Sequence, residues 1–379
     1  MKNLTSIWND IVTRKMYVTG ACGALYDGTS PDGTCYEPDS IQKVHQSYGR
    51  PYQLPNSTAH NETCANIGNM LFNWRMLEVT GDAKYAELVE TCLYNSILSG
   101  ISLDGKKYFY TNPLRISADL PYTLRWPKER TEYISCFCCP PNTLRTLCQA
   151  QNYAYTLGSE GIYCNLYGAN TLTTNWRDKG EIALTQKTAY PWEGNVRVEF
   201  DRVPRKAGVF SLFLRIPEWC EKAMLTVNGE LVPVAAKANT YAEVKRTWKK
   251  GDVVEWVMDM PVRLLEAHPL AEEIRNQVVV KRGPLVYCLE SMDMRGGGSI
   301  DNVLIPADIK LIPKKVTIEG SPVVALEGKA RLISSNSWEG ILYRPVSFAG
   351  KTVDIRLIPY YAWGNRGKGE MTVWMPLGR

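Results

Sequence analysis

The sequence predicts a multidomain protein in which an all-α part comes first and β-sandwich modules follow. Three observations support this order. Apolar residues recur at helical spacing between about residues 57 and 157, and they alternate with period two after about residue 160. The chain has 379 residues, which is room for two or three domains. It shows no internal repeat and no low-complexity linker.

The first predicted helix carries one stripe of large apolar residues. The stripe consists of Ile67, Met70, Leu71, Trp74 and Leu77. Ser57 and Thr58 precede it as caps, and Gly81 closes it, because glycine accepts the left-handed conformation at a helix end.

Two more helices are expected after Gly81. One opens at Asp82, presents an apolar face and ends at Gly100. The other follows the Pro140-Pro141 pair, since proline suits the first turn of a helix. Helices joined by short loops are typical of a bundle or a toroid.

The rest of the chain reads as β-structure. Residues 196–200, 210–216, 225–227 and 253–260 have strand character, and Asn228-Gly229 between two short strands is a strong hairpin signal. We expect an α part at 1–158 and a β-sandwich at 159–270. Residues 271–379 form a second sandwich or complete the first.

Composition excludes several classes of partner. With 44 basic and 39 acidic residues, no charge excess points to nucleic acid or to an anionic membrane. No stretch approaches the roughly 18 apolar residues of a transmembrane helix, and the first twenty residues lack the apolar core of a signal peptide. Eight of the 11 cysteines precede residue 150, which favours a reducing, cytoplasmic location with a metal site over a disulfide scaffold.

The run Cys136-Phe137-Cys138-Cys139-Pro140, together with Glu62 and Cys64, carries the strongest chemical signal. Three thiolates and a carboxylate complete a four-ligand zinc site, and the alternative is a set of buried free cysteines. Glu62 and Cys64 would point about 200° apart on a regular helix, so we expect the start of a helix there. Cys138 and Cys139 are expected to need a non-helical kink. The long loop at 19–55 is expected to form a wall of the site.

Short motifs are spaced along the chain from about residue 16 to the C-terminus. They are Leu54-Pro55-Asn56, Glu62-Thr63-Cys64-Ala65, Leu93-Tyr94-Asn95, Ser99 to Gly105, Tyr110-Thr111-Asn112-Pro113-Leu114, Cys138-Cys139-Pro140-Pro141-Asn142, Leu214-Arg215-Ile216-Pro217-Glu218-Trp219 and Trp363-Gly364-Asn365-Arg366-Gly367. Their order and spacing resemble those of glycoside hydrolase family 127, the β-L-arabinofuranosidase family. The resemblance implies an (α/α)6-barrel catalytic domain followed by β-sandwich domains.

The resemblance also implies a cysteine glycosidase that binds Zn²⁺. The implied metal ligands are Glu62, Cys64, Cys138 and Cys139. Cys138 is the implied nucleophile of a retaining, two-step hydrolysis in which sulfur replaces the usual carboxylate. Glu90 and Tyr110 match further pocket residues that hydrogen-bond the sugar or the nucleophile. The alternatives are a solvated helix face for Glu90 and core packing for Tyr110.

Other residues near these motifs are less specific. Cys136 is either a neighbour that supports the site or a packing residue. His45 and His60 flank the site in sequence and are candidates for hydrogen bonds to substrate, although a single loop histidine is usually incidental. His268 reads as structural.

One position departs from the family pattern. The acid/base glutamate of the family lies sixteen residues before the zinc-binding glutamate, and counting back from Glu62 reaches Gln46. A carboxamide cannot donate a proton as an acid, and loss of acid/base help costs on the order of 10²–10⁴-fold in rate. Glu37, Asp39 or His45 could serve instead, the substrate could have a good leaving group, the local alignment could be shifted, or nothing is hydrolysed.

The resemblance also begins in the middle of the catalytic domain. Family members carry several helices ahead of the region matching Met1, about half of the toroid. The expected explanations are a truncated gene product, a fragment of a split gene, or a partner chain that supplies the rest.

Two functional hypotheses follow. The first is hydrolysis of β-L-arabinofuranosides, or of a related furanoside of plant glycans, so the expected partner is a carbohydrate. The second is a non-catalytic carbohydrate-binding or remnant protein in which zinc is structural; a thiol switch rests only on the adjacent cysteines. Family members often self-associate, so a homodimer is a candidate assembly, although no stripe identifies an interface.

Overall fold

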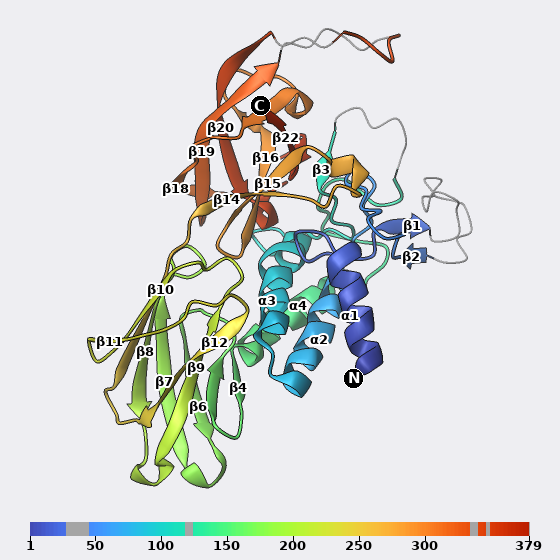
Figure 1. Cartoon of the computed structure of the whole chain (residues 1–379). Coiled ribbons are helices and arrows are strands. Elements are labelled where there is room, and N and C mark those ends of the chain that lie inside the picture. The colour runs from blue at the N-terminus through green and yellow to red at the C-terminus, as the bar shows by residue number, and fades with distance from the viewer. Residues whose placement is uncertain (28–44, 118–123, 334–339, 346–348, 379) are drawn as a thin grey trace.

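The computed structural model describes residues 1–27, 45–117, 124–333, 340–345 and 349–378. An α part comes first, a β-sandwich lies in the middle, and a second β part follows (Figure 1). The helices lie beside the upper end of the middle sandwich and below the C-terminal sheet in that view. The predicted order of α before β is therefore confirmed.

Among the residues that the structure describes, the α part contains four α-helices. They are α1 (Lys2–Arg14), α2 (Thr63–Thr80), α3 (Ala83–Thr91) and α4 (Cys139–Gln149). A π-helical segment (Cys92–Ile97) and a 3₁₀ turn (Leu98–Gly100) continue α3, and a second 3₁₀ turn (Ala150–Tyr153) follows α4. Sequence reasoning missed α1, although its buried Trp8 belongs to the same apolar core as α2 and α3.

The boundaries of α2 differ in part from the prediction. The helix begins at Thr63, so Ser57 and Thr58 are not its caps; Glu62, with an extended ψ of 137°, precedes the first turn. The predicted end at Gly81 is correct, and this residue has a left-handed φ of 70°. The stripe predicted for this helix packs against α3, with Ile67, Met70, Trp74 and Leu77 buried.

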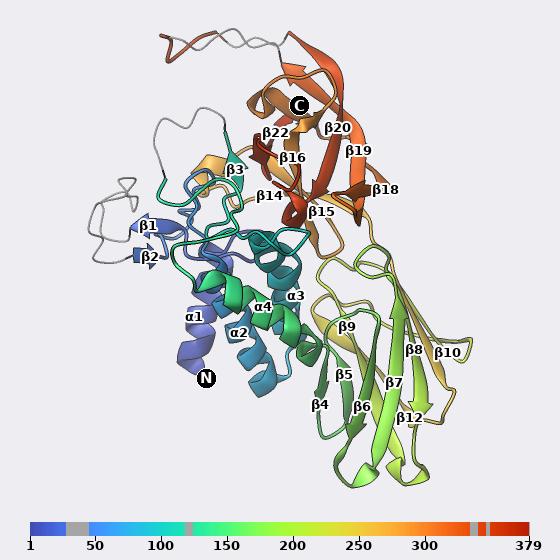
Figure 2. The ribbon, with the colours of Figure 1, turned by 180° about the vertical axis from the view of Figure 1, so that it is seen from behind.

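The second predicted helix starts as expected. The side chain of Asp82 accepts a hydrogen bond from the backbone N–H of Lys84 and so satisfies one free amide of the first turn. Figure 2 shows α4 lying across the other helices, with its C-terminal end beside the middle sandwich. Within the part of the chain that the structure describes, no helix combines the length and the apolar character needed to cross a bilayer.

A small hairpin joins the α part from the long loop. It pairs β1 (Leu25–Asp27) with β2 (His45–Ser47) in antiparallel fashion. Most of the loop expected to wall the site, including Glu37 and Asp39, lies outside the described residues.

The middle part is a sandwich of two sheets. Its strands are β4 (Tyr155–Leu157), β5 (Gly161–Cys164), β6 (Asn170–Asn175), β7 (Glu181–Thr188), β8 (Asn195–Arg202), β9 (Val209–Ile216), β10 (Ala223–Val227), β11 (Glu230–Val232), β12 (Thr240–Thr247) and β13 (Val253–Met258). One sheet has the order β11-β10-β13-β8-β7-β6 and the other β12-β9-β5-β4. Asn228 and Gly229 form the predicted turn between β10 and β11, with φ of 52° and 84°.

The C-terminal part is built on one ten-stranded sheet. Its strands are β14 (Val262–Glu266), β15 (Gln277–Arg282), β16 (Leu285–Met294), β17 (Val303–Pro306), β18 (Ile312–Ile318), β19 (Ser321–Ile333), β20 (Gly350–Pro359), β21 (Met371–Thr372) and β22 (Met375–Gly378), together with β3 (Arg115–Ile116) from the α part. This part begins at β14, ahead of the boundary at residue 271 expected from the sequence. Its sheet is separate from the middle sandwich, so it does not complete the first one.

Two polar side chains join the α part to the C-terminal sheet. Asn95 donates from Nδ2 to the carbonyl of Pro284 (2.9 Å) and accepts at Oδ1 from the amide of Val286 (2.8 Å). Arg130 donates to the carbonyls of Ser99 and Tyr361 (2.9 and 3.2 Å). The helices are therefore fixed to the β parts by specific bonds as well as by apolar packing.

Candidate active site and metal centre

The structure brings four potential metal ligands together from two helix N-termini. One ligand atom each from Glu62, Cys64, Cys138 and Cys139 lies within 4.8 Å of the others. The Cys64 and Cys139 sulfurs are 3.5 Å apart, and those of Cys138 and Cys139 are 3.7 Å apart. The Oε1 atom of Glu62 lies 3.3 Å from the Cys138 sulfur and 3.6 Å from that of Cys139. We call these four residues the cysteine cluster.

These spacings fit a tetrahedral ion. Ligands at about 2.0–2.3 Å from a tetrahedral zinc lie roughly 3.3–3.8 Å from one another. The four separations given above fall in that range, and the other two pairs of ligand atoms lie within 4.8 Å. Three thiolates and one carboxylate are also a donor set that zinc accepts. The residues present therefore fit a bound metal ion.

The first pair of ligands is placed by the start of α2. Glu62 lies just outside the helix and Cys64 in its first turn, so the helix start expected between them is present. The Thr63 amide donates to the carbonyl of Tyr110 (2.9 Å), which fixes this helix start against the neighbouring chain. A Cβ on Gly100 would lie 2.7 Å from the Thr63 side chain, so this close approach requires glycine.

A buried amide network supports the same helix start. Asn112 donates from Nδ2 to the carbonyl of Asn61 (2.9 Å) and to the Thr63 hydroxyl (3.0 Å). Its Oδ1 accepts from the Ser99 hydroxyl at 2.6 Å. Asn112 is fully buried, so these bonds satisfy groups that would otherwise be costly to desolvate. They explain why the Tyr110–Leu114 motif lies beside the cluster.

The second pair of ligands sits at the N-terminus of α4. Cys138 is the residue before the helix and Cys139 its first residue. The expected non-helical kink is wrong, because Cys138 has helical angles (φ −75°, ψ −41°). Pro140 and Pro141 occupy the first turn, where no intrahelical N–H is needed. The positive end of the helix dipole therefore faces both sulfurs and favours their ionised form.

When no cation is bound, hydrogen bonds among the thiols help to set their pKa values. Hydrogen bonds from Cys139 and Asn142 lower the pKa of Cys64 to about 7. Burial and the hydrogen bond to Cys64 raise the pKa of Cys138, and the hydrogen bond to Cys64 together with burial does the same for Cys139. Without a cation, the three thiols therefore do not favour being ionised together. A bound cation inverts this preference, because coordination deprotonates a thiol outright.

Asn142 was not assigned a role from the sequence, although it belongs to the cysteine motif. Its Nδ2 donates to the Cys64 sulfur at 3.0 Å. Its Oδ1 accepts from Arg145 at 2.6 Å, which fixes the orientation of the amide. Groups that orient ligands in this way tune metal affinity. The signal was present in the sequence, since Asn142 lies one helical turn after Cys138.

Gln46 and Tyr110 lie together at the edge of the cluster. The Nε2 of Gln46 donates to the Tyr110 hydroxyl at 2.6 Å. Burial, followed by the charges of Glu62 and Cys138, raises the pKa of Tyr110. The Tyr110 ring stacks on Trp126 with centroids 3.7 Å apart, a partner that sequence reasoning missed. The position at which the family pattern has a carboxylic acid is therefore occupied by the neutral amide of Gln46, which is hydrogen-bonded to the neutral hydroxyl of Tyr110.

The remaining candidates are distributed as follows. His60 is fully buried, and its ring packs edge-on against Tyr26 and Tyr110. Cys136 lies next to the cluster, with its sulfur 3.8 Å from that of Cys138. His45 lies in β2 beside Gln46, and the structure does not describe its side chain. His268 stacks on Tyr52 in another part of the molecule, 4.4 Å between centroids.

Glu90 is not brought to the cluster. Its carboxylate forms an ion pair with Arg215 of β9 (2.5 Å) and accepts a hydrogen bond from the Tyr190 hydroxyl (2.8 Å). Both partners belong to the middle sandwich, and Glu90 is fully buried, so it is not on a solvated helix face either. In this structure Glu90 therefore joins α3 to the sandwich, and its expected role in the pocket stays a prediction.

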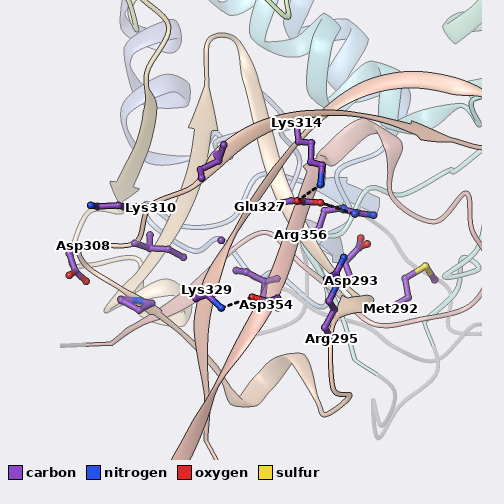
Figure 3. A pocket seen from close by; sticks show the side chains of 15 residues that line it. Met292, Asp293, Arg295, Asp308, Lys310, Lys314, Glu327, Lys329, Asp354 and Arg356 are labelled. Atoms are coloured by element: carbon purple, nitrogen blue, oxygen red, sulfur yellow. Dashed lines mark hydrogen bonds and ion pairs between the residues drawn. The ribbon is translucent and has the colours of Figure 1, made fainter.

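Two cavities help to locate a substrate site. One of about 390 Å³ lies between α1 and α2 and reaches Gln46 and His60 at the edge of the cluster. Another, of about 650 Å³, lies on the C-terminal sheet. Figure 3 shows that several of its charged groups pair with one another, Lys314 and Arg356 with Glu327 and Lys329 with Asp354. The described residues that line this second cavity include no cysteine, histidine or aromatic side chain, so we take the cysteine cluster as the candidate active site.

Comparison with known proteins gives matches along nearly the whole chain. Three family models match in tandem: the β-L-arabinofuranosidase GH127 catalytic domain at 1–152, the GH127 middle domain at 161–260 and the glycoside hydrolase family 127 C-terminal domain at 262–376. A curated relative, the non-reducing end β-L-arabinofuranosidase of Bifidobacterium longum subsp. longum, is 31% identical over 381 residues. That alignment covers 97% of this chain and 54% of the relative, so the chain spans about half the length of the curated protein.

Solved structures agree. A chain described as a glycoside hydrolase is 89% identical with a TM-score of 0.96; the match covers 100% of this chain and 62% of that one. A GH127 β-L-arabinofuranosidase from Geobacillus stearothermophilus T6 is 36% identical with a TM-score of 0.87, over 98% of this chain and 56% of that one. Together with the domain matches and the shared motifs, these similarities show that the chain belongs to glycoside hydrolase family 127.

Proposed function

We propose that this chain carries the catalytic centre of a retaining glycoside hydrolase that acts on β-L-arabinofuranosides or on a related furanoside of plant glycans. The cysteine cluster is the observation that carries the proposal, because its spacing suits zinc and it lies beside Tyr110 and Gln46. The relatives named as β-L-arabinofuranosidases support the choice of sugar. We also propose that α1 to α4 belong to an (α/α)6 barrel.

Glu62, Cys64, Cys138 and Cys139 would hold the ion. Zinc, when bound, supplies a positive charge that keeps the coordinated sulfur ionised at neutral pH. The Cys138 sulfur attacks the anomeric carbon, the bond to the leaving oxygen breaks, and a covalent thioglycoside forms on Cys138. Water then attacks the same carbon and loses a proton to bulk solvent, the carbon–sulfur bond breaks to regenerate the Cys138 thiolate, and the sugar leaves with retained configuration.

Cys138 suits the role of nucleophile better than its neighbour. Cys138 is partly exposed, whereas Cys139 is almost fully buried at 1% exposure. Substrate can therefore reach the Cys138 sulfur, while Cys139 is placed to hold the ion. Cys136 adds a third sulfur next to Cys138 and contributes polarisable surface around the reacting atom.

Gln46 limits the first step. Its amide already donates to the Tyr110 hydroxyl and has no acidic proton to give to the leaving oxygen. We therefore expect slow hydrolysis of ordinary glycosides, by about 10²–10⁴-fold relative to an enzyme with an acid at this position. A leaving group that needs no proton, such as p-nitrophenolate, should be released much more readily.

The test is release of p-nitrophenol from p-nitrophenyl β-L-arabinofuranoside by the zinc-loaded chain. Turnover should disappear in Cys138→Ser, fall on treatment with a chelator and return with added zinc. Metal analysis should give one zinc per chain in the wild type, and less in Cys64→Ser. Turnover that persists in Cys138→Ser would refute the assigned nucleophile.

Gln46 also favours a second candidate, a non-catalytic carbohydrate-binding or remnant protein with structural zinc. Four protein ligands already close a structural site, so the ligand count fits both functions. One zinc per folded chain with no turnover on activated furanosides would support this second candidate and refute the enzyme.

A further inference from the structure

The side chain of Tyr110 is held beside the cysteine cluster from several directions. Its backbone carbonyl accepts from the Thr63 amide at 2.9 Å, so the residue is fixed to the helix start that carries Glu62 and Cys64. Its hydroxyl accepts a hydrogen bond from Nε2 of Gln46 at 2.6 Å. Because Gln46 is the donor in that bond, the hydroxyl keeps its own proton for donation to a sugar or a sulfur.

Trp126 covers one face of the Tyr110 ring. The two ring centroids are 3.7 Å apart and the ring planes differ by 18°, so the rings are stacked nearly in parallel. Both side chains are buried, with 7% of Trp126 and 5% of Tyr110 exposed. Stacked aromatic pairs stabilise one another beyond the area they bury. The indole therefore restricts the positions that the Tyr110 ring can take.

The chain around Trp126 is anchored by contacts that do not involve the cysteine cluster. Tyr108 and Thr131 exchange two backbone hydrogen bonds, of 2.9 and 3.1 Å. Arg130, next to Thr131, is buried and donates to the carbonyl of Ser99 at 2.9 Å. These bonds fix the returning chain against the strand that leads to Tyr110. Trp126 is thus placed independently of any metal ion or sugar.

The same stack belongs to the apolar packing around the sulfurs. Cys139 is only 1% exposed and lies in one group of contacting buried side chains with both rings. The other buried members are Tyr26 and Ile134, and Cys64, Cys136 and Cys138 pack against the group. Electrostatic interactions are stronger where water is excluded. Trp126 can therefore affect the cluster in two ways, by fixing the Tyr110 hydroxyl and by keeping water from Cys139.

We propose that Trp126 is a positioning residue of the catalytic centre, whose indole holds the Tyr110 hydroxyl beside the cysteine cluster and closes the Cys139 side of the cluster to water. Trp126 acts through Tyr110. The inference rests on the proposed function, because the position of the hydroxyl matters only where a reaction takes place at the cluster. An indole with a structural role alone would stabilise the fold without either effect.

The first measurement compares two variants in the hydrolysis assay. Trp126→Leu keeps an apolar side chain but removes the stack, whereas Trp126→Phe keeps an aromatic ring. For p-nitrophenyl β-L-arabinofuranoside, Trp126→Leu should lower kcat by about 10–100-fold with little change in KM, since small displacements of a reacting group are costly. Trp126→Phe should recover most of the loss. Added to Tyr110→Phe, Trp126→Leu should cost much less, because the hydroxyl that the indole positions is already absent.

The second measurement needs no turnover. Alkylation of the metal-free chain with N-ethylmaleimide, followed by peptide mass spectrometry, reports solvent access to Cys139. Trp126→Leu should speed this labelling at least about threefold, and Trp126→Phe much less. Trp248→Leu is the matched control, because Trp248 stacks on Phe200 in the middle sandwich with centroids 4.4 Å apart. It should lower Tm but leave kcat and the labelling of Cys139 as in the wild type.

Three results would overturn the proposal. They are an unchanged kcat or unchanged Cys139 labelling in Trp126→Leu, an equal cost of Trp126→Leu with and without the Tyr110 hydroxyl, and a Trp126→Phe variant that is no better than Trp126→Leu. A wild-type chain without turnover would count against the proposed function. The labelling of Cys139 then decides the role of Trp126 by itself.

Discussion

Arg215 offers the sharpest test of what holds the α part to the middle sandwich. Its guanidinium is fully buried and lies 2.5 Å from the carboxylates of both Glu87 and Glu90. Its Nε donates to the carbonyl of Asn165 at 2.6 Å. Methionine in its place keeps an apolar chain of similar length and removes the charge, so Arg215→Met isolates the electrostatic contribution.

The magnitude follows from what remains after the change. Removing one partner of a buried ion pair costs about 3–5 kcal/mol, and the lost bond to Asn165 adds about 1 kcal/mol. Glu90 still accepts a hydrogen bond from Tyr190, and Glu87 still accepts one from the Glu218 amide. Neither carboxylate is left without a partner, so we expect no cost beyond the sum of the ion-pair and hydrogen-bond contributions. We expect a loss of about 4–6 kcal/mol in the free energy of unfolding. For a unit of 150–250 residues this lowers Tm by roughly 10 °C or more.

Differential scanning calorimetry at pH 7 measures this loss. Arg197→Met is the matched control in the same sandwich, since Arg197 pairs at the surface with Glu255 and should cost at most about 1 kcal/mol. Adding Glu87→Gln and Glu90→Gln to Arg215→Met should restore part of the stability by removing the unpaired charges. If Arg215→Met costs no more than Arg197→Met, the reasoning is wrong.

Three further changes give separate outcomes. Gln46→Glu should raise kcat/KM on alkyl furanosides by about 10²–10⁴-fold and have little effect on kcat/KM for the p-nitrophenyl glycoside. The same fold increase on both substrates would contradict this expectation. Asn142→Ala should weaken metal binding by about 10–100-fold and raise the pKa of Cys64 above about 7, read from the pH dependence of alkylation in the metal-free chain. Burial raises the pKa of Glu90 above 4.5, so the folded state holds this proton more tightly. The contribution of Glu90 to stability is therefore fully present below the ordinary pKa of a glutamate and is lost as pH rises through the raised folded pKa, and Glu90→Gln should remove that slope from urea midpoints.

The sequence indicated those features whose cause is local. The Pro140-Pro141 pair predicts the start of α4, although the kink expected at Cys138 and Cys139 is absent, and Gly81 predicts the end of α2. The partner of Glu90 was not predictable in this way. Arg215 lies in another domain, and nothing in the helical pattern around Glu90 says what its face meets. The same holds for the stacking of Tyr110 on Trp126, which depends on how a loop folds back.

The buried network also links the C-terminal part to the cysteine cluster, although none of the four cluster residues belongs to that part. Arg130 binds backbone carbonyls of the C-terminal part, including that of Trp363, and its guanidinium also holds the carbonyl of Ser99. Ser99 in turn orients Asn112, and Asn112 holds the start of α2 through Thr63. Each link is a short hydrogen bond between buried groups, so a shift of the C-terminal strands displaces the helix start that carries Glu62 and Cys64. Metal ligands need placement to a fraction of an ångström, and here part of the placement of the cysteine cluster comes from a domain that contributes none of its four residues.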